Sequence, residues 1–194
     1  MKLVILDRDG TINADSDDFV KTADEWVPLP GSLEAIAKLN HAGWHVVVVS
    51  NQSGLGRGLF DAYTLNEMHA KMNALLMPLG GRVDAVFFCP HAPEDDCRCR
   101  KPRPGLFEDI GLRFGIDMAG VPAVGDTLRD LQAASTVGCM PHLVRTGKAA
   151  SLDEAGVQAM REKVPGLTVH ADLAAFVDAL LAAEGRRAAD GRRA

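Results

Sequence analysis

The feature that most constrains this chain is a short apolar run, residues 3–6, that ends in the tetrad Asp7-Arg8-Asp9-Gly10. Such a run before a turn signal is typical of a buried strand, and Gly10 permits an abrupt turn directly after it. Alternation along a strand places Asp7 and Asp9 on the same side. Two carboxylates this close need a cation or a shared proton, and hard oxygen donors favour Mg²⁺. A surface turn is the alternative for such a pair standing alone.

Strand-like apolar runs alternate with helical patterns along the whole chain. The strand-like runs are Leu3–Leu6, Trp44–Val49, Val83–Cys89, Val121–Val124 and His142–Val144. Helical spacing is expected within 33–39, 65–76, 106–114, 128–137 and 173–181. Buried strands joined by helices predict a doubly wound parallel sheet, a Rossmann-like α/β fold. Ligands bind beyond the carboxyl ends of such strands, and each motif described below directly follows one of the runs.

Length and composition indicate a single domain over residues 1–184 and exclude some functions. The chain has 194 residues, 47% of them hydrophobic and 24% charged, with a net charge of −5. The negative charge argues against nucleic-acid binding, although a local basic pocket can still hold an anionic substrate. No apolar stretch is long enough to span a membrane and no signal-peptide pattern is present, so a cytoplasmic protein without membrane contact is expected. A monomer is expected, and residues 185–194 are expected to form a disordered tail.

The carboxylates support phosphoryl transfer. Asp7 can attack phosphorus and form an aspartyl-phosphate, while Asp9 acts as acid and base toward the leaving oxygen and the attacking water. Asp126, which follows a later strand in Gly125-Asp126, supplies a third carboxyl. Mg²⁺ between Asp7, the backbone carbonyl of Asp9 and Asp126 would offset the repulsion between the anions and hold the phosphoryl oxygens.

Three further residues fit a phosphate pocket. The hydroxyl of Ser50 follows an apolar strand and can face a phosphate, although a helix cap or turn is the common role of such a residue. Lys101 can stabilise negative charge on the transferred phosphoryl group, its alternative being an ordinary surface lysine. Asp130, four residues after Asp126, can orient Lys101 or the metal ligands, or it is simply an exposed helix acid.

A second metal site is predicted in the loop 89–99. Cys89, His91, Cys97 and Cys99 supply the Cys₃His set of a closed, tetrahedral zinc site. Such a site would be structural and would stabilise a loop too polar to pack by itself. Free or core cysteines are the alternative, and Cys139 is interpreted as an ordinary buried thiol.

Arg57 lies in the glycine-rich stretch Gly54-Leu55-Gly56-Arg57-Gly58. An arginine there could hold a second phosphate through two parallel hydrogen bonds, and a surface arginine in a flexible loop is an equal alternative. Between residues 13 and 30 no helical or strand period is visible, so this segment is expected to form a flap beside the pocket.

Taken together, Asp7-x-Asp9-Gly10-Thr11, Ser50-Asn51, Lys101-Pro102 and Gly125-Asp126-x-x-x-Asp130 resemble the haloacid dehalogenase superfamily of phosphatases over residues 1 to about 148. The cysteine-histidine loop, Asn51-Gln52-Ser53-Gly54 with Arg57-Gly58, and Arg145-Thr146-Gly147-Lys148 resemble the D-glycero-D-manno-heptose 1,7-bisphosphate 7-phosphatase family within it. This resemblance implies removal of the 7-phosphate from a phosphorylated sugar on the route to lipopolysaccharide heptose, with catalytic Mg²⁺ and structural Zn²⁺. It also implies a short flap and zinc loop in place of a large cap domain.

By the same resemblance Asp7 is the nucleophile, Asp9 the acid/base and Asp126 a magnesium ligand. Ser50 and Lys101 steady the phosphoryl group. The implied substrate-binding residues are Asp15, Ser16, Asp17 and Asp18 of the flap, Asn51, Gln52, Ser53, Arg57 and Arg100. Thr127 stands where some members of the superfamily carry lysine, so a role of that side chain in the pocket does not follow.

Three alternative functions are consistent with parts of the pattern. Histidinol-phosphate phosphatases share the carboxylate pair and a similar zinc loop, but a monophosphate bearing an amine does not call for Arg57. A phospho-receiver module would carry its acceptor aspartate after an interior strand, whereas Asp7 follows the first run. A zinc-based nucleic-acid module is opposed by the acidic net charge.

Overall fold

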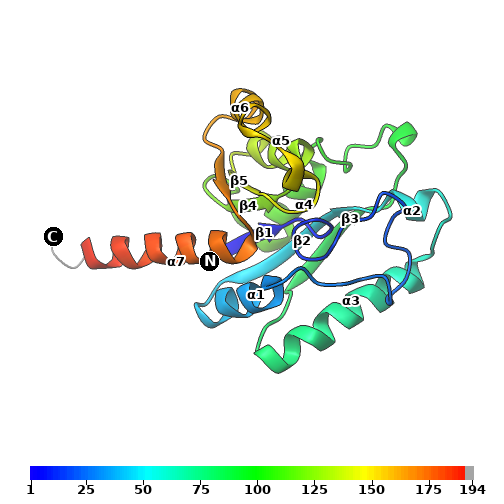
Figure 1. The fold of residues 1–194 in the computed structure, drawn as a ribbon, viewed down its shortest axis with the longest axis horizontal. Helices are drawn as coiled ribbons and strands as arrows, with labels where there is room; N and C mark the ends of the chain where they lie inside the picture. Colours follow the sequence, from blue (N-terminus) through cyan, green and yellow to red (C-terminus); the bar gives the residue numbers. More distant parts are fainter. Residues whose placement is uncertain (191–194) are drawn as a thin grey trace.

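Six parallel strands form a single sheet in the computed structural model, which describes residues 1–190 (Figure 1). The strand order is β3-β2-β1-β4-β5-β6. Strands β2 and β3 therefore extend the sheet on one side of β1, and β4, β5 and β6 extend it on the other, so the order of strand addition reverses between β1 and β4. Ile5 of β1 pairs with Val47 of β2 on one side and with Ala123 of β4 on the other. The predicted doubly wound parallel fold is confirmed. The strands are β1 Leu3–Leu6, β2 His45–Asn51, β3 Ala85–Cys89, β4 Pro122–Gly125, β5 Met140–Val144 and β6 Thr168–His170.

The strand β6 was not predicted. Its three residues, Thr168 to His170, form no apolar run, and they pair only with β5 at the edge of the sheet. An edge strand needs little apolar surface, so the sequence pattern carries too weak a signal to find it.

Helices cover both faces of the sheet, as the helical spacings predicted. Val4, Leu6, Val46 and Val48 contribute to the core on the face covered by α1, α3 and α7. Their neighbours along the same strands, among them Leu3, Ile5 and Val47, enter the core under α4 and α5. Both faces of the sheet are therefore buried under helices, which explains why the sequences of these strands are continuous apolar runs. The α-helices are α1 Ser32–His41, α2 Ser53–Gly56, α3 Ala62–Leu76, α4 Gly105–Phe114, α5 Leu128–Thr136, α6 Glu154–Lys163 and α7 Leu173–Asp190. The 3₁₀ helices are η1 Met77–Leu79, η2 Pro93–Asp95 and η3 Gly147–Ser151.

The segment 13–30 crosses the carboxyl end of the sheet as a loop held by a few anchors. Asn13 forms isolated bridges to Asp9 and to Pro28, and the side chain of Trp26 is fully buried in the core. The Lys71 Nζ atom of α3 donates to the carbonyl of Ala23 at 2.7 Å. The flap is thus attached at its base and near its end, and the described residues contain no large cap domain.

The C-terminal helix corrects one expectation. Residues 185–194 were expected to be disordered, but α7 continues to Asp190 (Figure 1). Arg186 and Arg187 on this part of the helix are exposed. Alanine and arginine have high helix propensity, so a helix that is packed through Phe176 and Val177 continues along its exposed end. The remaining positions of the expected tail, 191–194, lie outside the described residues.

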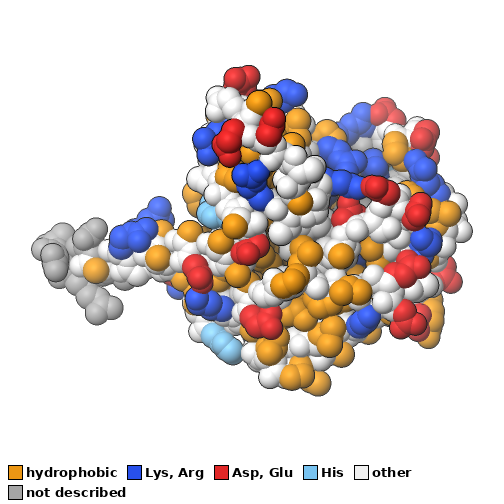
Figure 2. Space-filling view, in the orientation of Figure 1, with side chains coloured by type: hydrophobic (Ala, Val, Ile, Leu, Met, Phe, Trp, Pro, Cys, Tyr) orange, Lys and Arg blue, Asp and Glu red, His pale blue; other side chains and the backbone are white. Residues whose placement is uncertain are grey.

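Acidic and basic side chains are interspersed over the visible face, and a group of basic ones gathers beside the loop that follows β3 (Figure 2). Within residues 1–190, no helix combines the length and the apolarity that crossing a membrane requires.

We expect Phe176→Ala to lower the free energy of unfolding by about 3–5 kcal/mol, because it would leave a cavity where α7 packs on the sheet. Leu112→Ala is the matched control, since Leu112 is 81% exposed, and it should change stability by less than about 0.5 kcal/mol. Urea unfolding followed by circular dichroism measures both. Equal stability of the two variants would contradict the packing described for α7.

Candidate active site

The ends of β1, β2 and β4 open into a cavity of about 280 Å³ at the carboxyl edge of the sheet. This is the edge where the strand order reverses, as expected for an open α/β sheet. Most of the predicted site residues line it: Asp7, Asp9, Asp15, Ser16, Asp17, Ser50, Asn51, Gln52, Ser53, Arg57, Arg100, Lys101, Asp126 and Asp130. Asp18 does not line it; Asp18 lies on the exposed outer part of the flap, where its carbonyl accepts a hydrogen bond from Lys21.

Lys101 lies at the centre of the charge arrangement. Its Nζ atom is 2.6 Å from Asp7 Oδ1 and 2.6 Å from Asp130 Oδ1, and it donates to the carbonyl of Val49 at 2.9 Å. Burial by itself lowers the pKa of a lysine, but the charges of Asp130 and Asp7 outweigh it and the pKa of Lys101 is raised. Lys101 is therefore a fixed cation beside Asp7.

The backbone of Lys101 is held by Asn51 at the end of β2. Asn51 Nδ2 donates to the Lys101 carbonyl at 3.1 Å, and the Lys101 amide donates to Asn51 Oδ1 at 3.0 Å. Both polar ends of the Asn51 side chain are thereby engaged with backbone. Asn51 therefore fixes the position of the Lys101 backbone. The predicted contact between Asn51 and substrate stays a prediction.

Asp7, Asp126 and Asp130 form a cluster whose carboxylate oxygens lie within 4.8 Å of one another. Burial and the neighbouring charge of Asp130 raise the pKa of Asp7 well above its ordinary value, and the same two causes raise the pKa of Asp126 to about 7. The single positive charge of Lys101 does not balance the negative charge that three ionised carboxyl groups would carry. Asp126 Oδ1 is buried without a hydrogen-bond partner. A buried, all-oxygen set with an unpartnered atom fits a divalent cation such as Mg²⁺.

Gly10 and Gly147 allow the loops to approach Asp126 this closely. A Cβ atom at Gly10 would lie 2.3 Å from Asp126 Oδ2, and Gly147 is similarly crowded. Both glycines also have positive φ angles, which larger residues rarely adopt. The Lys148 amide, next to Gly147, donates to Asp126 Oδ2 at 2.7 Å. The orientation of Asp126 therefore depends on two glycine turns.

Asp130 is oriented by the start of α5. Its Oδ2 atom accepts hydrogen bonds from the Thr127 amide at 3.0 Å and from the Thr127 hydroxyl at 2.6 Å, leaving Oδ1 for Lys101. This assigns Thr127 a capping and orienting contact. The predicted link between Asp130 and Lys101 is present.

Asp9 differs from the other acids of the pocket. Its carboxylate faces Arg8, Asn13 and Gln52 instead of the carboxylate cluster. Burial raises the pKa of Asp9, but the charge of Arg8 and the hydrogen bonds from Asn13, Arg8 and Gln52 outweigh this, so the pKa is lowered. The cluster contains Asp130 where the sequence predicted Asp9, and a metal contact through the backbone carbonyl of Asp9 stays a prediction.

Cations and flap residues surround the rest of the cavity. Arg57 is half exposed, 3.8 Å from Glu94 and stacked over the Phe19 ring at 5.8 Å. Lys148 is 3.3 Å from Asp15 and also pairs with Asp17, which links the flap to the loop after β5. Arg129 and Lys148 line the cavity but were missed as site residues; Arg129 follows Asp126 by three positions, a spacing that could have suggested it.

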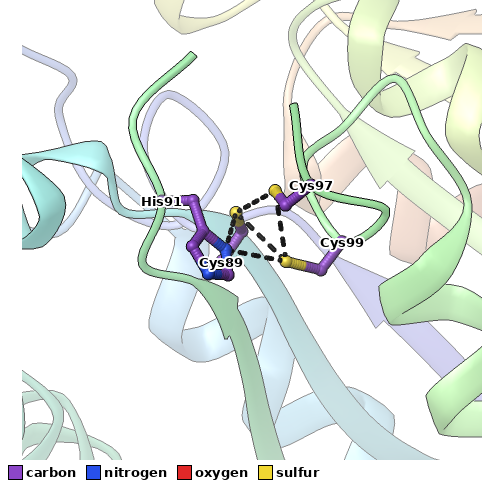
Figure 3. A group of neighbouring side chains, drawn as sticks. All are labelled: Cys89, His91, Cys97 and Cys99. Atoms are coloured by element: carbon purple, nitrogen blue, oxygen red, sulfur yellow. Dashed lines mark hydrogen bonds between the residues drawn. The ribbon is translucent and has the colours of Figure 1, made fainter. Parts of the chain in front are cut away.

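The four predicted zinc ligands converge beside the cavity (Figure 3). The three Sγ atoms are 3.4 to 3.5 Å apart, and His91 Nδ1 lies 3.2 Å from Cys99 Sγ and 3.6 Å from Cys89 Sγ. Despite desolvation, hydrogen bonds from Cys99 and Cys89 lower the pKa of Cys97 to about 7. Four soft donors facing one point fit a tetrahedral metal such as zinc. Cys139 is buried elsewhere, where burial raises its pKa to about 12, so it behaves as a core thiol.

Two family models match the chain. The model described as HAD-hydrolase-like matches residues 98–174, and the model described as Polynucleotide kinase 3 phosphatase matches residues 2–127. Together they span Asp7, Ser50, Lys101 and Asp126.

Curated relatives match nearly the whole length. The D-glycero-beta-D-manno-heptose-1,7-bisphosphate 7-phosphatase of Bordetella bronchiseptica is 57% identical over 93% of this chain and 98% of its own. The protein of the same name from Pseudomonas aeruginosa is 49% identical over 92% and 97%. The crystal structure of D,D-heptose 1.7-bisphosphate phosphatase from B. bronchiseptica complexed with magnesium and phosphate has a TM-score of 0.86, with 56% identity over 93% and 98%.

The fold and the carboxylate site define a phosphatase of the haloacid dehalogenase type. At this identity and coverage, the chain belongs to the D-glycero-D-manno-heptose 1,7-bisphosphate 7-phosphatase family.

We expect Asp126→Asn to become more stable relative to the unsubstituted protein as the pH rises in metal-free buffer. The folded-state pKa of about 7 exceeds the ordinary value of 3.8, so the stability that Asp126 contributes is complete below its ordinary pKa and is lost as the pH rises through about 7. Asparagine does not titrate.

Urea unfolding at about pH 5 and about pH 8 should reveal a change in the stability difference on the order of 1 kcal/mol or more. Adding Mg²⁺ at the higher pH should stabilise the unsubstituted protein more than the variant. A stability difference that stays constant with pH would contradict the charge repulsion described for the cluster.

Proposed function

We propose that this protein hydrolyses the 7-phosphate of D-glycero-D-manno-heptose 1,7-bisphosphate, and that the β anomer named for its relatives is the preferred substrate. The observation that carries this proposal is the placement of Asp7. It lies at the end of β1, 2.6 Å from the Lys101 cation and beside Asp126 and Asp130. The chain also matches its curated relatives over nearly their full length. Residues 1–184 would act as one phosphatase domain.

In the proposed mechanism Asp7 attacks the 7-phosphorus and forms an aspartyl-phosphate as the sugar oxygen departs. Asp9 would enter this step in its protonated form and give that proton to the departing oxygen; the carboxylate left behind then takes a proton from the water that hydrolyses the intermediate. Lys101, held between Asp7 and Asp130, and the Ser50 hydroxyl offset the charge that spreads over the phosphoryl oxygens. The side chains of Asp7 and Asp126, with the Asp9 carbonyl, would hold Mg²⁺, which supplies positive charge for the phosphoryl oxygens.

A bisphosphate substrate accounts for an outer set of cations, Arg57, Arg100, Arg129 and Lys148, that lines the cavity besides Lys101. Within residues 1–190, Arg100 and Arg129 form no salt bridge, whereas Lys148 pairs with Asp15 and Asp17 and Arg57 lies 3.8 Å from Glu94. We assign the 1-phosphate to this outer set, with Arg57 as its expected partner. The names of the relatives favour the heptose substrate over histidinol phosphate. A cytoplasmic location, a monomeric state and a place on the route to lipopolysaccharide heptose stay predictions.

The loop 89–99 would hold structural Zn²⁺. The four ligands leave no position for substrate, and Arg100 and Lys101 follow Cys99 directly. A zinc-fixed loop would therefore set the position of Lys101 from one side while Asn51 holds it from the other.

We expect the purified protein to contain one equivalent of zinc by mass spectrometry of the metal, and Cys99→Ser to lose most of it together with thermal stability. The cause is the loss of one of four ligands in a closed site. Cys139→Ser is the matched control, because Cys139 lies outside the cluster, and it should retain the zinc. Equal zinc content in the two variants would contradict the assignment.

The central activity test is phosphate release with Mg²⁺ from both anomers of D-glycero-D-manno-heptose 1,7-bisphosphate and from histidinol phosphate at equal concentration. We expect the β bisphosphate to be hydrolysed fastest, and Asp7→Asn to lower its kcat by about 10³-fold or more, since the nucleophile is lost.

Glu162→Gln, an exposed substitution on α6, should leave the rate unchanged. Faster release from histidinol phosphate would overturn the substrate but keep the mechanism. Full activity of Asp7→Asn would overturn the mechanism.

A further inference from the structure

Arg8, the residue between the two aspartates, is almost completely buried, with 1% of its surface exposed. An arginine this deep is unusual unless its donors are engaged, because burying an unpaired charge is costly. Its guanidinium lies against α3, where Nη1 is 3.9 Å from the Met68 sulfur. The donors on its other side all point toward Asp9 and Gln52.

The Asp9 carboxylate is held by Arg8 as a planar fork. Nη2 donates to both carboxylate oxygens, at 2.8 and 3.0 Å, and Nε donates to Oδ1 at 3.1 Å. Asn13 Nδ2 adds a hydrogen bond to Oδ1 at 2.9 Å, and Gln52 Nε2 adds one to Oδ2 at 2.9 Å. The Asp9 side chain nevertheless keeps 21% of its surface exposed and lines the cavity.

Arg8 also determines which way the Gln52 amide points. A guanidinium can only donate, so the contact of 3.3 Å from Nη2 turns Gln52 Oε1 toward Arg8. The Nε2 end then faces Asp9 and, at 2.5 Å, the Ser50 hydroxyl. One buried cation thereby links Asp9, in the turn after β1, to Ser50 on β2 through the Gln52 side chain.

We infer that Arg8 is a positioning residue for the phosphoryl transfer. It acts through Asp9, holding the carboxylate in one plane from the buried side so that the exposed edge faces the oxygen that leaves phosphorus. This inference rests on the proposed acid/base function of Asp9. If Arg8 only stabilised the fold, replacing it would lower the activity toward all substrates equally. If Arg8 positions Asp9, replacing it should lower the activity most toward substrates whose leaving group needs a proton.

The test compares two leaving groups. A sugar or other alkyl oxygen needs a proton as it departs, whereas the weakly basic p-nitrophenolate departs without one. We expect Arg8→Met to lower kcat/KM for the heptose bisphosphate by about 10²-fold, which is the size of loss expected when general-acid catalysis is removed. For p-nitrophenyl phosphate the loss should be about ten times smaller. The ratio kcat/KM reports the transfer to Asp7 and excludes the later hydrolysis step. Arg8→Lys should restore part of the activity toward the alkyl substrate, because one ammonium can still contact Asp9.

Two further variants separate positioning from folding. Asn13→Leu leaves Arg8 in place and removes the hydrogen bond to Asp9 Oδ1 together with a local one to the Ala14 carbonyl. It should produce a smaller loss with the same selectivity, which keeps the test valid if Arg8→Met fails to fold. Met68→Leu changes the packing around Arg8 while leaving its donors to Asp9 in place, so it should affect both substrates alike. Equal losses for both substrates in Arg8→Met and Asn13→Leu would overturn the inference. Absence of hydrolysis by the unsubstituted protein would instead overturn the proposed function on which it rests.

Discussion

The pairing of Lys101 with Asp7 and Asp130 is the interaction on which the rest of the site depends. Three carboxyls are buried together at the end of the sheet, and burial raises the pKa of two of them, Asp7 and Asp126. One buried lysine partly offsets this charge, and the remainder favours a divalent cation. The protein therefore keeps Asp7, the proposed nucleophile, buried, where its interactions are strong, by surrounding it with compensating charge.

Lys101 reaches this position because several distant segments hold it. Asn51 at the end of β2 binds its backbone, the Val49 carbonyl accepts from its ammonium, and Thr127 orients Asp130 from the start of α5. The cysteine-histidine cluster ends two residues before Lys101, so the proposed zinc would act on catalysis through position alone. The flap attaches separately, through Trp26 in the core and through Lys148 near Asp126.

The two aspartates of the opening motif occupy opposite environments although they are two residues apart. Burial and the charge of Asp130 raise the pKa of Asp7, whereas the charge of Arg8, with hydrogen bonds from Asn13 and Gln52, outweighs burial and lowers that of Asp9. Titratable groups whose environments push their pKa values apart commonly have different roles in one reaction. Arg8 accounts for the Asp9 side of this difference, because its donors face Asp9, whereas Asp130 and burial account for the Asp7 side.

The sequence by itself determined the parallel sheet, the position of the candidate site at its carboxyl edge and the four Cys and His side chains of the loop 89–99 that converge. For the carboxylate cluster it predicted Asp7 and Asp126, but Asp9 in the place that Asp130 occupies. Those features depend on local periodicity and on which residues directly follow each strand, and both are visible along the chain. The tertiary structure decided the pairing of Asn51 with Lys101, the orientation of Asp9 by Arg8, the entry of Arg129 and Lys148 into the cavity and the exclusion of Asp18. These depend on contacts between residues far apart in sequence and on side-chain directions, which local patterns do not encode. The edge strand β6 and the end of α7 escaped prediction for a related reason, since neither buries enough apolar surface to leave a periodic signal.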